Sequence, residues 1–173
     1  SVDGPTITLA SLKGDVNGGT LEGSGTVTLG EGGIANIDMR VVTKDFAYDA
    51  PLDLRSLSDA DLRIAKQDDD FVVSGKVMIT DGGLTGDVNF DTGLLAAMTA
   101  RRRLDLTEQR NPFLERMRFD VNVNTAAPIL IDNNLAKAET QTKLRVVGTP
   151  YETGLLGQLT LDQGGEIRLN ERR

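Results

Sequence analysis

Apolar and polar residues alternate with a period of two along most of this 173-residue chain. In the segment 136–146 the even positions carry Ala, Thr, Leu and Val, whereas the odd positions carry charged or amide side chains. The segment 119–124 repeats the pattern, with Phe119, Val121 and Val123 on one side. Successive side chains of a strand point to opposite faces, so both segments are typical of half-buried antiparallel strands.

A nine-residue unit occurs three times, as GTVTLGEGG at 25–33, GKVMITDGG at 75–83 and GQLTLDQGG at 157–165. Each unit begins with glycine, alternates aliphatic and polar residues, and ends on a glycine pair. Because glycine adopts the positive φ that tight hairpin turns require, we expect a turn at each pair. The copies are unevenly spaced, which indicates a repeated hairpin with insertions rather than a solenoid. The predicted turn residues are Gly32, Gly33, Gly82, Gly83, Gly164 and Gly165.

Two segments depart from the strand pattern. Residues 91–106 place Leu94, Leu95 and Met98 at near-helical spacing, and Asn111 followed by Pro112 is a typical helix start. We therefore predict a mainly β fold with one or two short helices near residues 92–118. No linker divides the chain, so residues 1–173 are expected to form a single β-rich domain. The chain begins and ends in mid-pattern, which suggests an internal fragment of a longer protein.

The composition argues against most catalytic chemistry. The chain has no cysteine and no histidine, which removes disulfides, thiolate catalysis and the common zinc sites. We expect no enzyme activity, no catalytic residue, no metal and no cofactor. Asp59, Asp61 and Asp68–Asp70 lack the glycine-spaced loop of calcium sites and favour a solvated turn. The net charge of −7 disfavours nucleic acid as a partner, and the basic run Arg101–Arg103 is interpreted as a solvated helical face.

A sheet that is apolar on one face must cover that face with a second sheet, by closure or with a ligand. On the pattern alone, an ordinary sandwich core is the more common solution. The apolar positions are mostly aliphatic, which suits a flexible acyl chain better than a rigid ligand. The residues expected to line the face, and so to bind lipid or a strand, are Val27, Leu29, Val77, Ile79, Phe119, Val121, Val123, Leu144, Val146, Leu159, Leu161 and Ile167.

The C-terminal third resembles the TamB family, a subunit of the translocation and assembly module of Gram-negative envelopes. Five motifs, taken in their order along the chain, carry the resemblance. One of them, the family's Gly-Thr-x-x-x-Pro corner, is shortened here. The first half follows the same rhythm more loosely, for example in VSGKVMITDGG. The motifs are the alternating strand 119–123, the apolar segment 129–135, the Ala-rich strand 136–147, the corner 148–150 and the glycine unit 157–165.

This resemblance implies an elongated antiparallel sheet curled into an open, taco-like hydrophobic groove. It further implies a periplasmic location, in a protein anchored to the inner membrane of a Gram-negative bacterium. The expected role is outer-membrane protein assembly and secretion, the movement of phospholipid between the two membranes, or both. An Omp85-type, TamA-like outer-membrane barrel is the expected partner, through parts outside this fragment.

Two other functions stay open at this stage. A chaperone-like module would bind nascent outer-membrane β-strands, as hydrophobic peptide strands, by pairing them with a sheet edge. An adhesin or carbohydrate-binding β module would need aromatic platforms, and the chain is only 4% aromatic. A lipid carrier depends on the apolar face, whereas a strand chaperone depends on free backbone at an edge.

Overall fold

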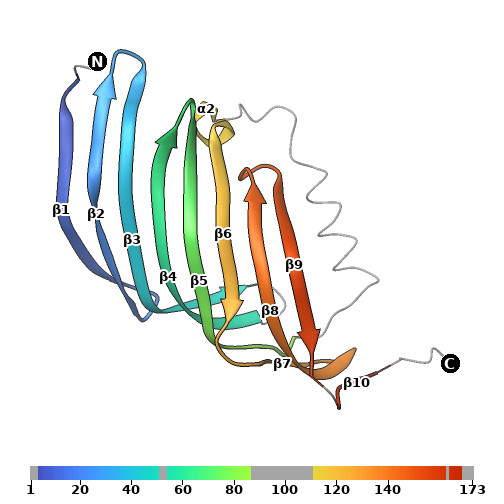
Figure 1. The fold of residues 1–173 in the computed structure, drawn as a ribbon. Coiled ribbons are helices and arrows are strands. Elements are labelled where there is room, and N and C mark those ends of the chain that lie inside the picture. The colour runs from blue at the N-terminus through green and yellow to red at the C-terminus, as the bar shows by residue number, and fades with distance from the viewer. Residues whose placement is uncertain (1–3, 51–53, 87–110, 163, 169–173) are drawn as a thin grey trace.

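One curled sheet of ten strands accounts for most of the structure (Figure 1). The computed structural model describes residues 4–50, 54–86, 111–162 and 164–168. Within these ranges the helical structure is a single four-residue helix, α2 (Pro112–Glu115). The mainly β prediction and the curled sheet are therefore confirmed, and the helix predicted at 91–106 lies outside the described residues.

The first five strands form an antiparallel meander. Asn17 and Gly18, with φ of 49° and 82°, make the first turn, as Asn-Gly does in tight hairpins. Gly32 and Gly33 lie at the second turn, where they were predicted, and Asp68 has φ of 53° at the fourth. The strands are β1 (Thr6–Val16), β2 (Gly19–Gly30), β3 (Gly33–Ala50), β4 (Leu54–Gln67) and β5 (Asp70–Leu84).

The second half of the sheet is built around β8 (Ala136–Gly148). On one side of it lie β6 (Met117–Thr125) and β7 (Ile129–Asp132), which follow each other in the same direction. On its other side β9 (Thr153–Leu161) and β10 (Glu166–Ile167) are also in line. Both β6 and β7 pair with β5 in parallel, so the sheet is mixed rather than wholly antiparallel.

Two of the predicted hairpin turns are wrong. Gly82 and Gly83 lie inside β5, paired with Ser56 and Arg55 of β4. A Cβ on Gly82 would come within 3.0 Å of the Arg55 carbonyl oxygen, so this glycine permits close strand approach instead of chain reversal. Gly164, with φ of 102°, and Gly165 lie between β9 and β10. Because both strands run the same way along β8, this glycine pair forms a lateral step and not a hairpin.

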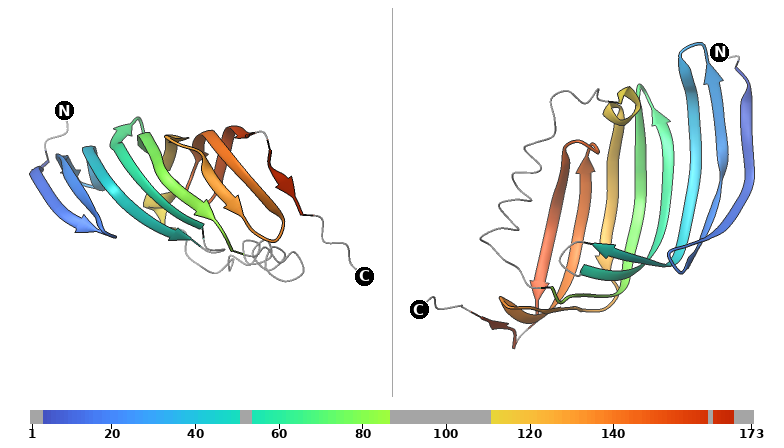
Figure 2. Two further views of the ribbon diagram at one scale, coloured as in Figure 1. Left: turned by 90° about the horizontal axis from the view of Figure 1, so that it is seen from below. Right: turned by 180° about the vertical axis from the view of Figure 1, so that it is seen from behind.

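The curl follows from irregularities in the strands. The β3–β4 register shifts between Thr43 and Phe46, where Asp45 has φ of 53°, and the β4–β5 register shifts between Leu57 and Ser58. Such bulges bend a strand and increase its twist. Beyond them, the end of β3 and the start of β4 turn behind the sheet in Figure 1 and cross in front of it in the view from behind (Figure 2).

Few hydrophobic side chains are buried. Among the described residues only Ile37, Phe71 and Val121 are, with 7%, 3% and 8% of their surface exposed. A sandwich would bury the facing side chains of two stacked sheets, whereas the described strands all belong to one sheet. The sandwich interpretation is therefore wrong for this part of the chain, and the apolar positions form a face rather than an enclosed core.

The helix α2 closes one end of this sheet beside β5 and β6. The Asn111 side-chain oxygen accepts a hydrogen bond from the Phe113 backbone N–H at 2.9 Å, and Pro112 occupies the first turn, as predicted. The Phe113 ring lies 4.8 Å from that of buried Phe71, centroid to centroid. The Arg116 guanidinium lies 5.3 Å from the Phe71 ring centroid. These contacts fix the position where the chain enters β6.

Candidate functional site: the apolar face of the sheet

Cross-strand register brings the predicted apolar residues onto one face, which we call the apolar face. One row of directly opposed residues runs from Leu62 through Gly75, Val121 and Val146 to Leu155. Opposed residues share a face, and alternation along each strand extends the assignment. All twelve predicted lining residues lie on it: Val27, Leu29, Val77, Ile79, Phe119, Val121, Val123, Leu144, Val146, Leu159, Leu161 and Ile167. Their role in binding stays a prediction.

The apolar face is only partly covered. Val121 at its centre is buried, and most of its aliphatic neighbours on β2 to β8 are half-buried. Toward the β9 edge the side chains are open to solvent, with exposed fractions of 64% for Leu155 and 56% for Leu159. A contiguous exposed apolar surface on a folded domain usually marks an interaction site.

The three repeated units share a feature that lies at their first residue. Gly25, Gly75 and Gly157 have φ of 152°, 135° and 139°. A Cβ on any of them would stand 2.1–2.3 Å from a carbonyl oxygen of the neighbouring strand. The repeat therefore encodes a point of close strand contact, and sequence reasoning missed it by attending to the terminal glycine pairs. A glycine inside an alternating strand was the available signal.

These three glycines form a line that crosses the apolar face obliquely, which we call the glycine diagonal. Followed across β3 and β4 through directly opposed residues, Gly25 on β2 is in register with Val73 on β5. Val73 is the residue before Gly75 on the same face of that strand. Followed across β8 and β6 in the same way, Gly157 on β9 is in register with Val77 on β5. Val77 is the residue after Gly75 on the same face of that strand. At these three positions the apolar face carries no side chain, whereas the strands between them carry Met39, Leu62 and Val121 on that face.

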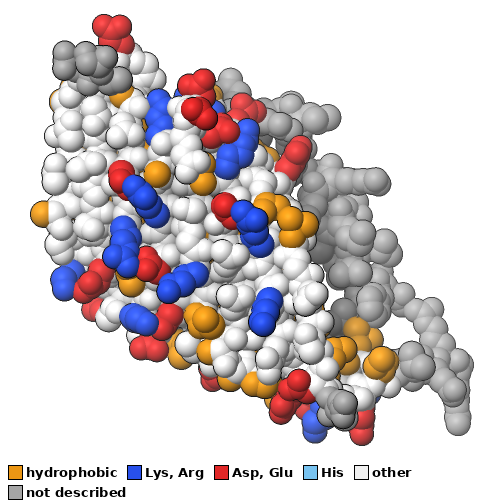
Figure 3. Space-filling model, in the orientation of Figure 1, with side chains coloured by type: hydrophobic (Ala, Val, Ile, Leu, Met, Phe, Trp, Pro, Cys, Tyr) orange, Lys and Arg blue, Asp and Glu red, His pale blue; other side chains and the backbone are white. Residues whose placement is uncertain are grey.

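The opposite face is charged, and several of its cations and anions are paired. In Figure 3 basic side chains lie next to acidic ones across this face. Arg40 donates to both carboxylate oxygens of Asp61, at 2.8 and 2.7 Å. Arg63 binds Asp38 in the same way, and so does Arg145 with Asp120. These bidentate bonds lower the pKa of each aspartate and raise that of each arginine.

The acidic residues considered for calcium are engaged elsewhere. Asp59 accepts a hydrogen bond from Lys44 at 2.5 Å, and Asp61 is bound by Arg40. Asp68 and Asp69 form the β4–β5 turn, and the side chain of Asp69 is 99% exposed. The predicted solvated turn is confirmed for Asp68 and Asp69 and is wrong for Asp59 and Asp61, which lie inside β4, and for Asp70, which begins β5. The basic run 101–103 lies outside the described residues. In the described part of the chain no group of three potential metal ligands comes together.

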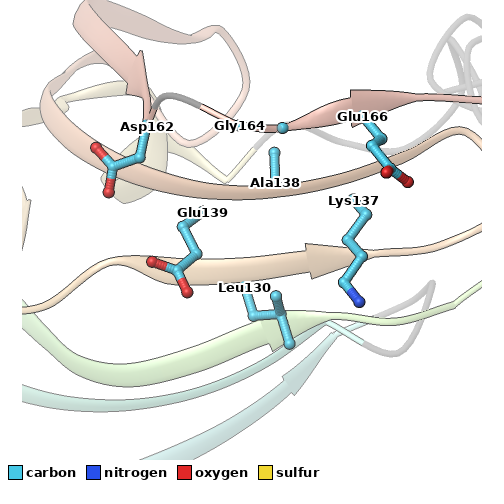
Figure 4. A pocket seen from close by; sticks show the side chains of 8 residues that line it. Leu130, Lys137, Ala138, Glu139, Asp162, Gly164 and Glu166 are labelled. Carbon is cyan, nitrogen blue, oxygen red and sulfur yellow. The ribbon is translucent and has the colours of Figure 1, made fainter.

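A hollow of about 420 Å³ lies at the step between β9 and β10 (Figure 4). Its wall includes Glu139, Asp162 and Glu166 together with Lys137 and the methyl group of Ala138. In Figure 4 the Glu166 carboxylate points away from those of Asp162 and Glu139, and all three residues are exposed. Scattered and solvated carboxylates provide neither a metal site nor a paired acid and base. The hollow is thus a consequence of the step in the edge.

No helix in the described ranges is long and apolar enough to cross a membrane. No curated protein and no solved structure shows significant similarity to the chain. A family model, the TamB C-terminal domain, matches residues 10–173. The match covers the meander and the strands around β8 alike, and it associates the chain with the translocation and assembly module of the bacterial envelope. The chain belongs to the TamB C-terminal domain family.

Proposed function

We propose that the apolar face carries phospholipid acyl chains between the inner and outer membranes, as the periplasmic part of a protein anchored in the inner membrane. The observation that carries the proposal is a single-layer sheet with one aliphatic, half-exposed face and one charged face. Such a sheet offers an apolar surface without enclosing it, so a head group can stay in water while the acyl chain is covered.

The energetics favour a continuous surface of this kind. Each methylene removed from water contributes about 0.8 kcal/mol, so a chain of ~16 carbons crossing an aqueous space unaided costs on the order of 10 kcal/mol. An apolar strip removes most of that barrier along its length. Contacts must also stay weak at any one place, because a tightly held lipid would not move on.

The chemistry of the face fits a flexible ligand. Of the twelve lining residues, Phe119 alone is aromatic, and the others are Val, Leu and Ile. Rigid ligands are held by shaped aromatic pockets with a few polar anchors, which this face does not offer among its described residues. An acyl chain needs only continuous aliphatic contact. The proposed partners of the full protein, such as an Omp85-type outer-membrane barrel, would bind through other parts of it.

The test is mass spectrometry of an organic extract of the domain, purified from Gram-negative cells without detergent. We expect co-purifying phospholipid near one molecule per chain, and its loss in Val123→Arg, which puts a charge on the apolar face. The matched control is Asn122→Arg, one residue away on the charged face, which should retain lipid. Equal lipid in both variants, or none in the wild type, would contradict the proposal.

The same pair of variants separates this function from a chaperone for nascent outer-membrane strands. Strand capture depends on backbone groups at a sheet edge, and Val123 on β6 is separated from the edge strand β9 by β8. Normal capture of strands by Val123→Arg, combined with an absence of lipid in the wild type, would support the chaperone function instead.

A further inference from the structure

The two edges of the sheet differ in how they are protected. Among the described residues β1 pairs only with β2, and β9 pairs only with β8. The β1 edge follows Pro5, carries Lys13 and Asp15, and contains a register shift between Leu9 and Leu12. Proline, charge and bulges are the devices by which proteins prevent one sheet edge from pairing with another.

The β9 edge has none of these devices. The strand Thr153–Leu161 contains no charged residue and no proline, and its register with β8 is unbroken. Its four leucines are exposed, with fractions of 64% for Leu155, 58% for Leu156, and 56% for both Leu159 and Leu161. An uncharged, regular and aliphatic edge is a template for further strand pairing.

The sequence of β9 is complementary to itself about Gly157, its central residue. If two copies paired antiparallel about this point, Leu155 would face the partner's Leu159 on the apolar face, and Leu156 would face the partner's Gln158 on the other. Each chain carries a net charge of −7, yet no charged side chains would be opposed along this strand. Such an arrangement is an isologous, two-fold interface, in which every contact between two different residues occurs twice.

We propose that β9 pairs with β9 of a second copy of this chain, joining two ten-stranded sheets through one edge. The apolar faces of the two copies then continue into each other, because Leu155 and Leu159 belong to that face in both. This pairing depends on the edge and not on any lipid bound to the face. A nine-residue edge buries less surface than a standard stable interface, so the dimer should dissociate on dilution through the micromolar range.

Sedimentation velocity of the intact chain over that range tests the proposal. We expect a reversible dimer for the wild type and at least tenfold weaker association for Leu159→Lys, which places a charge on the β9 edge. The matched control is Ile7→Lys on β1, since Ile7 is 57% exposed and lies on the same face. A wild type that stays monomeric, or a dimer disrupted by Ile7→Lys and not by Leu159→Lys, would overturn the proposal.

Cysteine cross-linking tests the register, because the natural chain has no cysteine. Opposed residues of antiparallel strands have Cα atoms about 4.5–5.5 Å apart, a distance that a disulfide spans. Mixing Leu156→Cys with Gln158→Cys should therefore give a cross-linked dimer faster than either variant alone. Equal rates in the mixture and the separate variants would contradict this pairing. Monomers that bind a foreign aliphatic strand through β9 would show that the edge serves another partner, and would also overturn it.

Discussion

Gly75 lies directly opposite Leu62, and the two strands approach so closely there that a Cβ on Gly75 would stand 2.2 Å from the carbonyl oxygen of Asp61. Its φ of 135° is also one that other residues rarely adopt. Gly25 and Gly157 repeat both features against their own neighbouring strands. The first residue of each repeated unit is therefore a glycine because the local strand approach leaves no room for a Cβ.

The first prediction is that Gly75→Ala lowers the free energy of unfolding by about 3 kcal/mol, because backbone strain and a steric clash add at one position. Urea denaturation monitored by circular dichroism would measure the change. The control is Gly14→Ala, also within a strand, where a Cβ meets nothing within 4 Å. Gly14→Ala should leave stability unchanged or slightly raised. Equal effects of the two substitutions would contradict the importance of the close approach.

The second prediction concerns Phe71, the most deeply buried hydrophobic residue described. Phe71→Ala removes the ring that packs against Phe113 and lies beneath the Arg116 guanidinium, and should cost about 3–5 kcal/mol. The same denaturation experiment measures it, with Tyr48→Ala as control because Tyr48 is 51% exposed. A loss below about 1 kcal/mol would mean that α2 contributes little to holding this end of the sheet.

The third prediction is a loss of stability in acid. The arginine partners lower the pKa of Asp38, Asp61 and Asp120 in the folded state. As the pH falls, the folded state therefore binds fewer protons at these sites than the unfolded state does. Their contribution is present above the ordinary aspartate pKa of about 4 and is lost as the pH falls through the lowered values. Urea midpoints measured from pH 6 to pH 2 should therefore decline below about pH 4.

Replacing these three aspartates by asparagine should reduce that acid-side decline and lower the midpoint at pH 6. The pairs are exposed, so the change at pH 6 should be small and should shrink further in high salt. Asp15→Asn on the β1 edge is the control. If the triple variant and the wild type lost stability equally in acid, other carboxylates would be responsible for the loss.

Alternation along the chain was sufficient to predict the two faces of the sheet. Each lining residue from Val27 to Ile167 lies on the expected face. A shift of one residue in the pairing of a strand would move all its apolar side chains to the charged face, which is unfavourable. The helix start at Asn111 was also predictable, since its cap is a local hydrogen bond. Periodicity was thus sufficient to predict the strands and their faces, and local chemistry was sufficient to predict one helix cap.

Long-range pairing was not predictable in the same way. The parallel pairing of β5 with β6 depends on which end of the sheet the chain returns to, and alternation is identical for either direction. The step at Gly164 looked like a hairpin because a positive φ serves both purposes. Likewise, β6 and β7 read as separate strands, although they continue each other along β8. Sequence alone therefore predicted the face but neither its connectivity nor the unprotected edge at β9.

The last prediction tests whether the face binds acyl chains in proportion to their length. Each methylene contributes about 0.8 kcal/mol, so affinity for single-chain phospholipids below their critical micelle concentration should rise roughly fourfold per carbon. Isothermal titration or a displaced fluorescent fatty acid would measure the series. Val123→Arg should flatten the dependence, because the charge interrupts the row formed with Val77 and Leu144, whereas Asn122→Arg should preserve it. Affinity that does not change with chain length would indicate head-group binding and would exclude the apolar face as the carrier.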